Sequence, residues 1–78
     1  MLYELMIEYR GTNWIYFETN EPDLWDAYAE YKHLMLRCKV NIDNMYLKRL
    51  EIRTNNEDYE VLDWNEIDEH GEWAKVIK

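Results

Sequence analysis

Hydrophobic residues recur with helical spacing in one stretch of the chain, from Pro22 to about Cys38. Apolar side chains there fall at positions i, i+3, i+4 and i+7, which places them on one stripe of an α-helix. The stripe comprises Leu24, Ala27, Tyr28, Tyr31, Leu34, Met35 and Cys38. Asn20 is suited to cap the helix start, with Asp23 three residues later and Pro22 in the first turn. The pattern therefore predicts one long helix.

Trp25 lies beside this stripe rather than on it. Its ring is therefore a candidate for partial exposure. The interpretation that we favour is that the ring folds over the edge of a sheet, since so much apolar area is rarely left in water.

Shorter segments on both sides of the helix alternate between apolar and polar residues, which is typical of β-strands with one buried face. A turn over Arg10–Asn13, with Gly11 at its centre, joins the first two strands into a hairpin. The predicted strands are Leu2–Tyr9, Trp14–Glu18, Met45–Thr54, Tyr59–Trp64 and a last short one over Glu72–Ile77.

The alternation over Met45–Thr54 is uneven. Tyr46, Leu50 and Ile52 share a face with Lys48, whereas Met45 and Leu47 fall on the opposite face with Arg49, Glu51 and Arg53. In the first strand, Tyr3, Leu5, Ile7 and Tyr9 share one face.

This order of elements predicts an α+β fold. We expect a small antiparallel sheet of four to five strands with one long helix packed on one face, and residues 1–78 as a single compact domain without a linker. The far face of the sheet is expected to be solvated and mostly polar. It carries Glu4, Met6, Glu8, Arg49, Glu51 and Arg53.

Charge and aromatic content then limit the partners. The 78 residues carry 17 acidic and nine basic side chains, a net charge of −8. This balance disfavours direct binding to nucleic acid and favours a basic protein surface. Seven Tyr, four Trp and one Phe exceed what so small a core can bury, so some aromatic surface is expected to be exposed, as at a partner interface or in a homodimer.

Targeting signals and disulfide chemistry are not indicated. The first residues do not form a basic region followed by an apolar run, and no stretch has the length of a membrane span. Cys38 is the only cysteine, so it has no partner within the chain for a disulfide. We therefore expect a cytoplasmic protein that binds no membrane.

Candidate catalytic and metal-binding groups are few, and we expect no enzyme and no cofactor. Glu30 and His33 have the i, i+3 spacing of some di-metal sites, but those sites need such pairs on several helices. Cys38 lies near the negative end of the helix dipole and on the apolar stripe, so it is expected to pack rather than react. Ile67 and Asp68 break the calcium-loop pattern that starts at Asp63.

The distribution of acid is the feature that points to a function. From Thr54 to Glu72 there are eight acidic residues and no Lys or Arg, with aromatic residues between them. On an extended strand, Asp58 and Glu60 would project about 6.6 Å apart, comparable to successive phosphates of a nucleic acid. The alternative is that the run is only a solvated face. The candidate partner-binding residues are Glu57, Asp58, Tyr59, Glu60, Asp63, Trp64, Glu66, Asp68, Glu69 and Glu72.

Small size, strong acidity, one helix on a small sheet and this carboxylate-rich C-terminal half together resemble small phage-encoded inhibitors of host defence, among them anti-CRISPR proteins that mimic nucleic acid. The resemblance covers general character and no motif. It implies a non-enzymatic inhibitor, acting in the host cytoplasm, that blocks a positively charged nucleic-acid-binding surface of an effector.

A second hypothesis comes from the aromatic content. The chain would be a small structural or assembly protein that self-associates through exposed aromatic residues such as Trp25 and Trp73, with the acid serving solubility.

Overall fold

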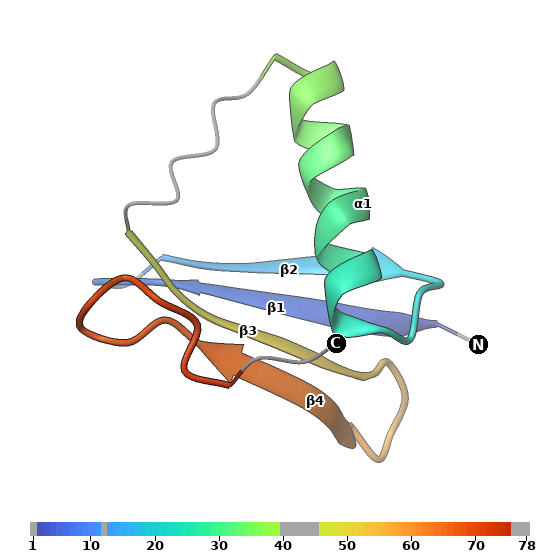
Figure 1. Ribbon diagram of the computed structural model, residues 1–78. Coiled ribbons are helices and arrows are strands. Elements are labelled where there is room, and N and C mark those ends of the chain that lie inside the picture. Colours follow the sequence, from blue (N-terminus) through green and yellow to red (C-terminus); the bar gives the residue numbers. More distant parts are fainter. Residues whose placement is uncertain (1, 12, 40–45, 76–78) are drawn as a thin grey trace.

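The computed structural model describes residues 2–11, 13–39 and 46–75. Four strands form one antiparallel sheet in the order β2-β1-β3-β4, and a single helix lies on one face of it (Figure 1). The elements are β1 (Tyr3–Tyr9), β2 (Trp14–Thr19), α1 (Leu24–Arg37), β3 (Leu47–Thr54) and β4 (Val61–Glu66). The predicted α+β fold is confirmed, with four strands.

The β1–β2 hairpin forms as predicted. The backbone N–H of Tyr9 donates to the carbonyl of Asn13 over 3.0 Å, and Tyr3 faces Thr19 at the far end of the ladder. Gly11 has a φ of +103°, a conformation that only glycine adopts without strain.

The helix begins two residues later than predicted, at Leu24, and its N-cap is Asp23 rather than Asn20. The Asp23 carboxylate accepts hydrogen bonds from the N–H groups of Trp25 and Asp26, both over 3.0 Å. The positive end of the helix dipole also stabilises a negatively charged cap, which is the physical reason that the helix starts after Asp23 rather than after Asn20.

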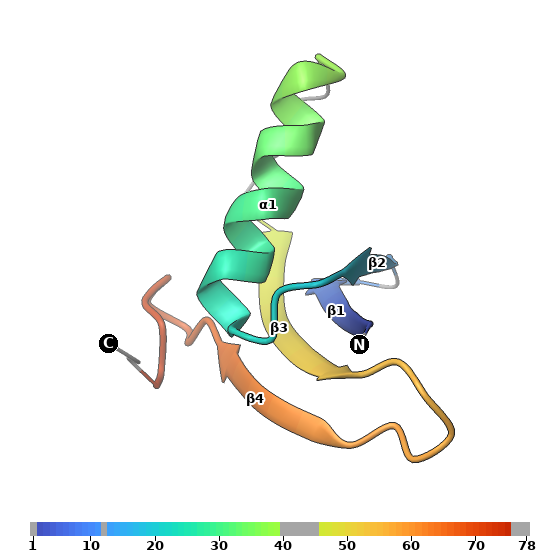
Figure 2. The same ribbon diagram turned by 90° about the vertical axis from the view of Figure 1, so that its right-hand side faces the viewer.

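The core lies between the inner face of the sheet and the first half of α1. Its buried residues are Leu5, Ile7, Leu24, Ala27, Tyr28, Tyr31, Leu47, Leu50 and Ile52. The last turns of α1 extend beyond the sheet (Figure 2), so Leu34 is 39% and Leu36 70% exposed. Cys38, which follows the helix, is exposed as well, and the prediction that it packs in the core is wrong.

Trp25 is half-buried and packs against the core. Its ring meets that of Trp73 edge to face, with 4.9 Å between the centroids and 80° between the planes. The contact holds the segment after β4 against the start of the helix.

A β-bulge explains the uneven alternation in β3. Glu8 pairs with Arg49 but Tyr9 pairs with Leu47, so Lys48 is the extra residue. The bulge turns Leu47 into the core, where it is 2% exposed, and the prediction that Leu47 lies on the polar face is wrong. Tyr46 precedes the strand and is exposed; Met45 lies outside the described residues.

The C-terminal third differs most from the prediction. β4 begins at Val61 rather than Tyr59, because Tyr59 has a positive φ of 50° and belongs to the turn. Within the described residues no fifth strand follows β4. Trp73 makes only an isolated bridge with Ile67 after a turn at Gly71, and the predicted strand end at Ile77 lies outside the described residues.

Truncating the centre of the core should destabilise the fold. Leu50 is fully buried, so Leu50→Ala should lower the free energy of unfolding by about 2–5 kcal/mol. Leu36→Ala is the matched control, because Leu36 is largely exposed and should change stability by about 0.5 kcal/mol or less. Urea unfolding followed by circular dichroism measures both, and equal losses would contradict this description of the core.

Candidate functional site

The outer face of the sheet, which is the face turned away from α1, is less solvated than predicted. Its central charged side chains are largely covered, with side-chain exposures of 13% for Glu4, 11% for Glu51 and 19% for Arg53. Met6, also on this face, is buried. The cause is a partial cover of aromatic rings from the neighbouring strands and turns.

Arg53 is the centre of this arrangement. Its guanidinium lies 4.8 Å from the ring of Tyr59 and 5.3 Å from that of Tyr16, and it forms ion pairs with Glu4 and Glu51 at 3.4 and 3.5 Å. The aromatic faces and the carboxylates offset part of the cost of removing this cation from water.

Arg49, four residues before Arg53 in β3, repeats the pattern. Its guanidinium bonds Glu51 and Glu66, both at 2.8 Å, and lies 4.6 Å from the ring of Trp64. Burial alone would lower the pKa of Arg49, but the hydrogen bonds and charges of the two carboxylates outweigh it and raise the pKa. The sheet therefore balances much of its own charge on this face.

Four aromatic side chains on and beside the outer face remain accessible to a partner. They are Trp14 (54% exposed), Tyr16 (50%), Tyr59 (50%) and Trp64 (37%). Trp14 and Tyr16 contact each other on β2, with 6.5 Å between their ring centroids.

The acidic run from Thr54 to Glu72 does not form one continuous row. Asp63 pairs with Lys75 at 3.1 Å, and Glu66 pairs with Arg49. Asp68 accepts the backbone N–H groups of Glu72 and His70, which lower the pKa of its carboxyl group and order the loop.

The remaining acids of the run separate to the two ends of β4. Glu57, Asp58 and Glu60 lie in the β3–β4 turn, and Glu69 and Glu72 lie in the loop after the strand; all five are exposed. The predicted 6.6 Å spacing does not apply to Asp58 and Glu60, since the intervening Tyr59 is not extended.

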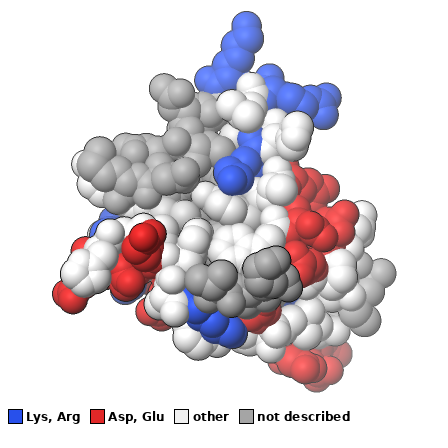
Figure 3. All heavy atoms as spheres, in the orientation of Figure 1, with Lys and Arg blue, Asp and Glu red and all other residues white. Residues whose placement is uncertain are grey.

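The fold builds a different acidic surface, which we call the acidic end. The β2–α1 connection and the start of the helix lie on the same side of the molecule as the β3–β4 turn (Figure 1). Acidic side chains gather over this side (Figure 3). The acidic end comprises Glu18, Glu21, Asp23, Asp26, Glu30, Glu57, Asp58 and Glu60, all exposed.

Short contacts hold these segments together. The side-chain amide of Asn55 donates to Glu18 over 3.0 Å, which joins the β3–β4 turn to β2. The buried Thr19 donates its hydroxyl proton to the carboxylate of Glu30 and accepts the N–H of Glu21 over 3.0 Å. Throughout the described ranges, no Lys or Arg lies within 4.0 Å of an acidic-end carboxylate.

Basic residues collect at the opposite end of the helix. Lys32, Arg37 and Lys39 lie on or after the last turns of α1, where Figure 3 shows positive side chains projecting. The molecule therefore carries opposite charges at the two ends of its helix.

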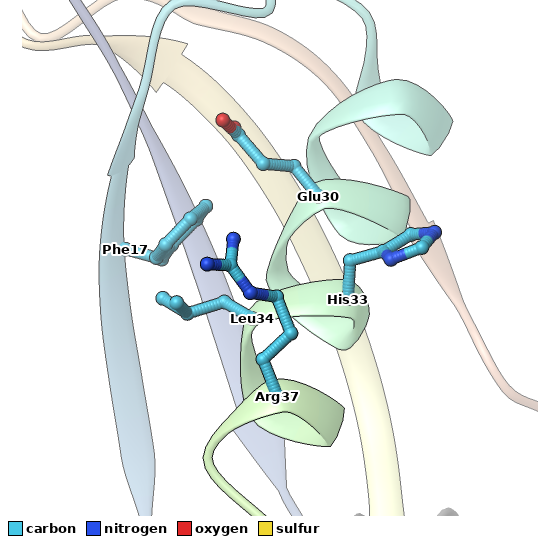
Figure 4. Close-up of a pocket in the computed structure, with 5 residues that line it drawn as sticks. All are labelled: Phe17, Glu30, His33, Leu34 and Arg37. Carbon is cyan, nitrogen blue, oxygen red and sulfur yellow. The ribbon is translucent and has the colours of Figure 1, made fainter.

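A groove of about 480 Å³ lies between α1 and β2, lined by Phe17, Glu30, His33, Leu34 and Arg37 (Figure 4). Arg37 reaches over the apolar floor, whereas the Glu30 and His33 side chains point in different directions. Glu30 is already bonded to Thr19. Among the described residues, no group of three or more His, Cys, Asp or Glu side chains could hold a metal ion.

Comparisons with protein-family models, with curated proteins and with solved structures found no match. In the part of the chain that the structure describes, no helix is both long and apolar enough to cross a membrane.

The hydrogen bond from Tyr59 to Glu4, over 3.1 Å, makes a pH-dependent contact on the outer face. This bond and the nearby carboxylate charge raise the pKa of Tyr59 above its ordinary value of 10.0. The folded state holds the phenol proton of Tyr59 more tightly than the unfolded state does. The hydrogen bond to Glu4 therefore stabilises the fold fully below pH 10.0, and this stabilisation is lost as the pH rises through the pKa of Tyr59 in the folded state.

We expect Glu4→Gln to lower the pKa of Tyr59 towards 10.0, as read by ultraviolet difference titration against Tyr59→Phe. Glu8→Gln is the control: it removes the same charge from the same strand, but Glu8 pairs with Lys48 at 3.6 Å. An equal shift in both variants would mean that net charge, not this contact, sets the pKa.

Proposed function

We propose that this chain is a non-enzymatic, cytoplasmic binding module whose acidic end docks on a positively charged surface of a nucleic-acid-binding protein and blocks it. An inhibitor of the anti-CRISPR type would act in this way. The supporting observation is the group of eight exposed carboxylates that lack a basic partner, on one side of a small domain. Such a group creates a negative potential that attracts basic surfaces and competes with phosphates.

The groups that could carry catalysis favour binding over reaction. The carboxylate of Glu30 already accepts a hydrogen bond from Thr19. The groove beside β2 is open, and the Glu30 and His33 side chains that line it point in different directions, which does not favour proton transfer between them.

The proposal predicts a salt-sensitive complex. A partner captured from cytoplasm by the immobilised chain, then purified, should bind nucleic acid, and nucleic acid should compete with the chain for it. Affinity should fall steeply between 0.1 and 1 M salt, as the screening length shortens from about 10 to about 3 Å. Affinity that does not change over this range would overturn the proposal.

A matched pair of charge reversals locates the docking surface. Glu57→Lys with Asp58→Lys removes acid from the acidic end, and Glu69→Lys with Glu72→Lys makes the same change in net charge at the other end of β4. The first variant should lose affinity about tenfold or more and the second much less, with circular dichroism unchanged in both. Equal losses would show that net charge alone drives binding, and the opposite order would place the interface beside Glu69 and Glu72.

A second candidate function, homotypic assembly, is favoured by the exposed aromatic side chains of the outer face. Trp25 and Trp73 are poor candidates for this contact, because they already pack on each other within one copy. Trp14 and Tyr16, on an edge strand, are better placed.

A further inference from the structure

The two edges of the sheet differ in how well they are covered. At β4, the pairing shifts between Ile52 and Arg53, which marks a bulge in the edge strand. The N–H of Ala74 bonds to the carbonyl of Glu66 over 2.7 Å, and Lys75 reaches back to Asp63. Bulges, returning chain and an edge lysine are the devices by which proteins keep an edge strand from pairing.

The β2 edge has no such cover from the described residues. In an antiparallel ladder, every second residue directs its backbone groups to the neighbouring strand and the others direct them away. The bond from Tyr9 to Asn13 assigns the odd-numbered residues of β2 to β1. Trp14, Tyr16 and Glu18 therefore present their N–H and C=O groups at the open edge.

The opposite side of β1 confirms this assignment. Even-numbered residues of β1 should bond to β3, and the carbonyl of Leu2 accepts the N–H of Asn55 over 3.1 Å, in register with the β1–β3 ladder. The alternation therefore holds across both sides of β1.

We propose that β2 pairs antiparallel with β2 of a second copy of this chain, about a two-fold axis at Tyr16. The pairing rests on the second candidate function, homotypic assembly, and Glu18 is the one acidic-end residue that takes part in it. It sets Tyr16 opposite its own copy and Trp14 opposite Glu18 of the other copy. All three edge residues then pair, and the two sheets become one sheet of eight strands.

The side chains suit this register. On the inner face, half-buried Ile15 of each copy would lie opposite half-buried Phe17 of the other. The groove beside Phe17 and Leu34 leaves room there for an added side chain (Figure 4). On the outer face, Glu18 would face Trp14 rather than another Glu18.

The antiparallel arrangement also separates charge. The end of β2 that carries Glu18 belongs to the acidic end, so a two-fold axis at Tyr16 sends the two acidic ends in opposite directions. Two copies with a charge of −8 each then pair with their acidic ends apart, and salt should strengthen rather than weaken their association.

Sedimentation of the full chain at increasing concentration tests the proposal. We expect a dimer that tightens with salt, and a chain that stays monomeric at all concentrations and salt levels would overturn it. Tyr16→Pro removes an N–H that points away from β1, a position where an edge strand tolerates proline, so it should abolish the dimer and keep the circular dichroism spectrum. Tyr16→Thr, which keeps the N–H, should still dimerise. Loss of the dimer in both variants would indicate ring packing instead of strand pairing.

Disulfide trapping in a Cys38→Ser background tests the register without relying on the proline variant. A two-fold at Tyr16 puts the two Cα atoms of Tyr16→Cys about 5.5 Å apart, within disulfide range. Trp14→Cys is the control, since its two copies would be about 14 Å apart. Mild oxidation should cross-link the first variant much faster, and equal or reversed rates would contradict the register. The result of this cross-linking experiment does not test the acidic-end proposal. That proposal is tested by binding to a different protein, which salt should weaken.

Discussion

A single helix has to cover one face of a four-stranded sheet, and the rest of the structure depends on that constraint. The inner face closes on the buried half of α1, around residues such as Leu24 and Tyr28, and no other helix of the described residues covers the outer face. That face is therefore protected by its own side chains. Arg53 and Arg49 lie under aromatic rings from neighbouring strands and turns, and carboxylates neutralise their charges. Ion pairs and aromatic rings together cover this face of the sheet, as a second helical layer does in larger folds.

The same constraint decides where unbalanced charge can remain. Acidic side chains on the central strands form ion pairs with Arg49 and Arg53, whereas those at the helix start and in the β3–β4 turn do not. Repulsion among them is partly offset at the helix, because Asp23 and Asp26 lie at the positive end of the dipole, where each acid contributes about 0.3–1 kcal/mol. A concentrated acidic surface is thus compatible with a stable domain of this size.

Local patterns predicted the hairpin, the helix and the α+β class, because each depends on neighbours in the chain. Three features could not be read that way. The helical period places Cys38 on the apolar stripe of the helix. It does not show that the helix extends past the sheet, which leaves Cys38 exposed. One extra residue, Lys48, reverses the face of Leu47, and alternation alone does not reveal a bulge. The acidic end brings together Glu18, Glu30 and Glu57 from three separate segments of the chain. The sequence shows the acidic run from Thr54 to Glu72, but it does not show which acidic residues the fold places on one surface.

Charge separation along the helix has a consequence for how the molecule meets another. Acidic side chains lie around its first turn, and Arg37 and Lys39 lie at its last, so the domain is an electric dipole as well as a net anion. Net charge sets whether a basic partner attracts the molecule; the dipole exerts a torque that rotates it during approach. The domain would approach a basic surface with its first helical turn leading, so that fewer collisions occur in unproductive orientations.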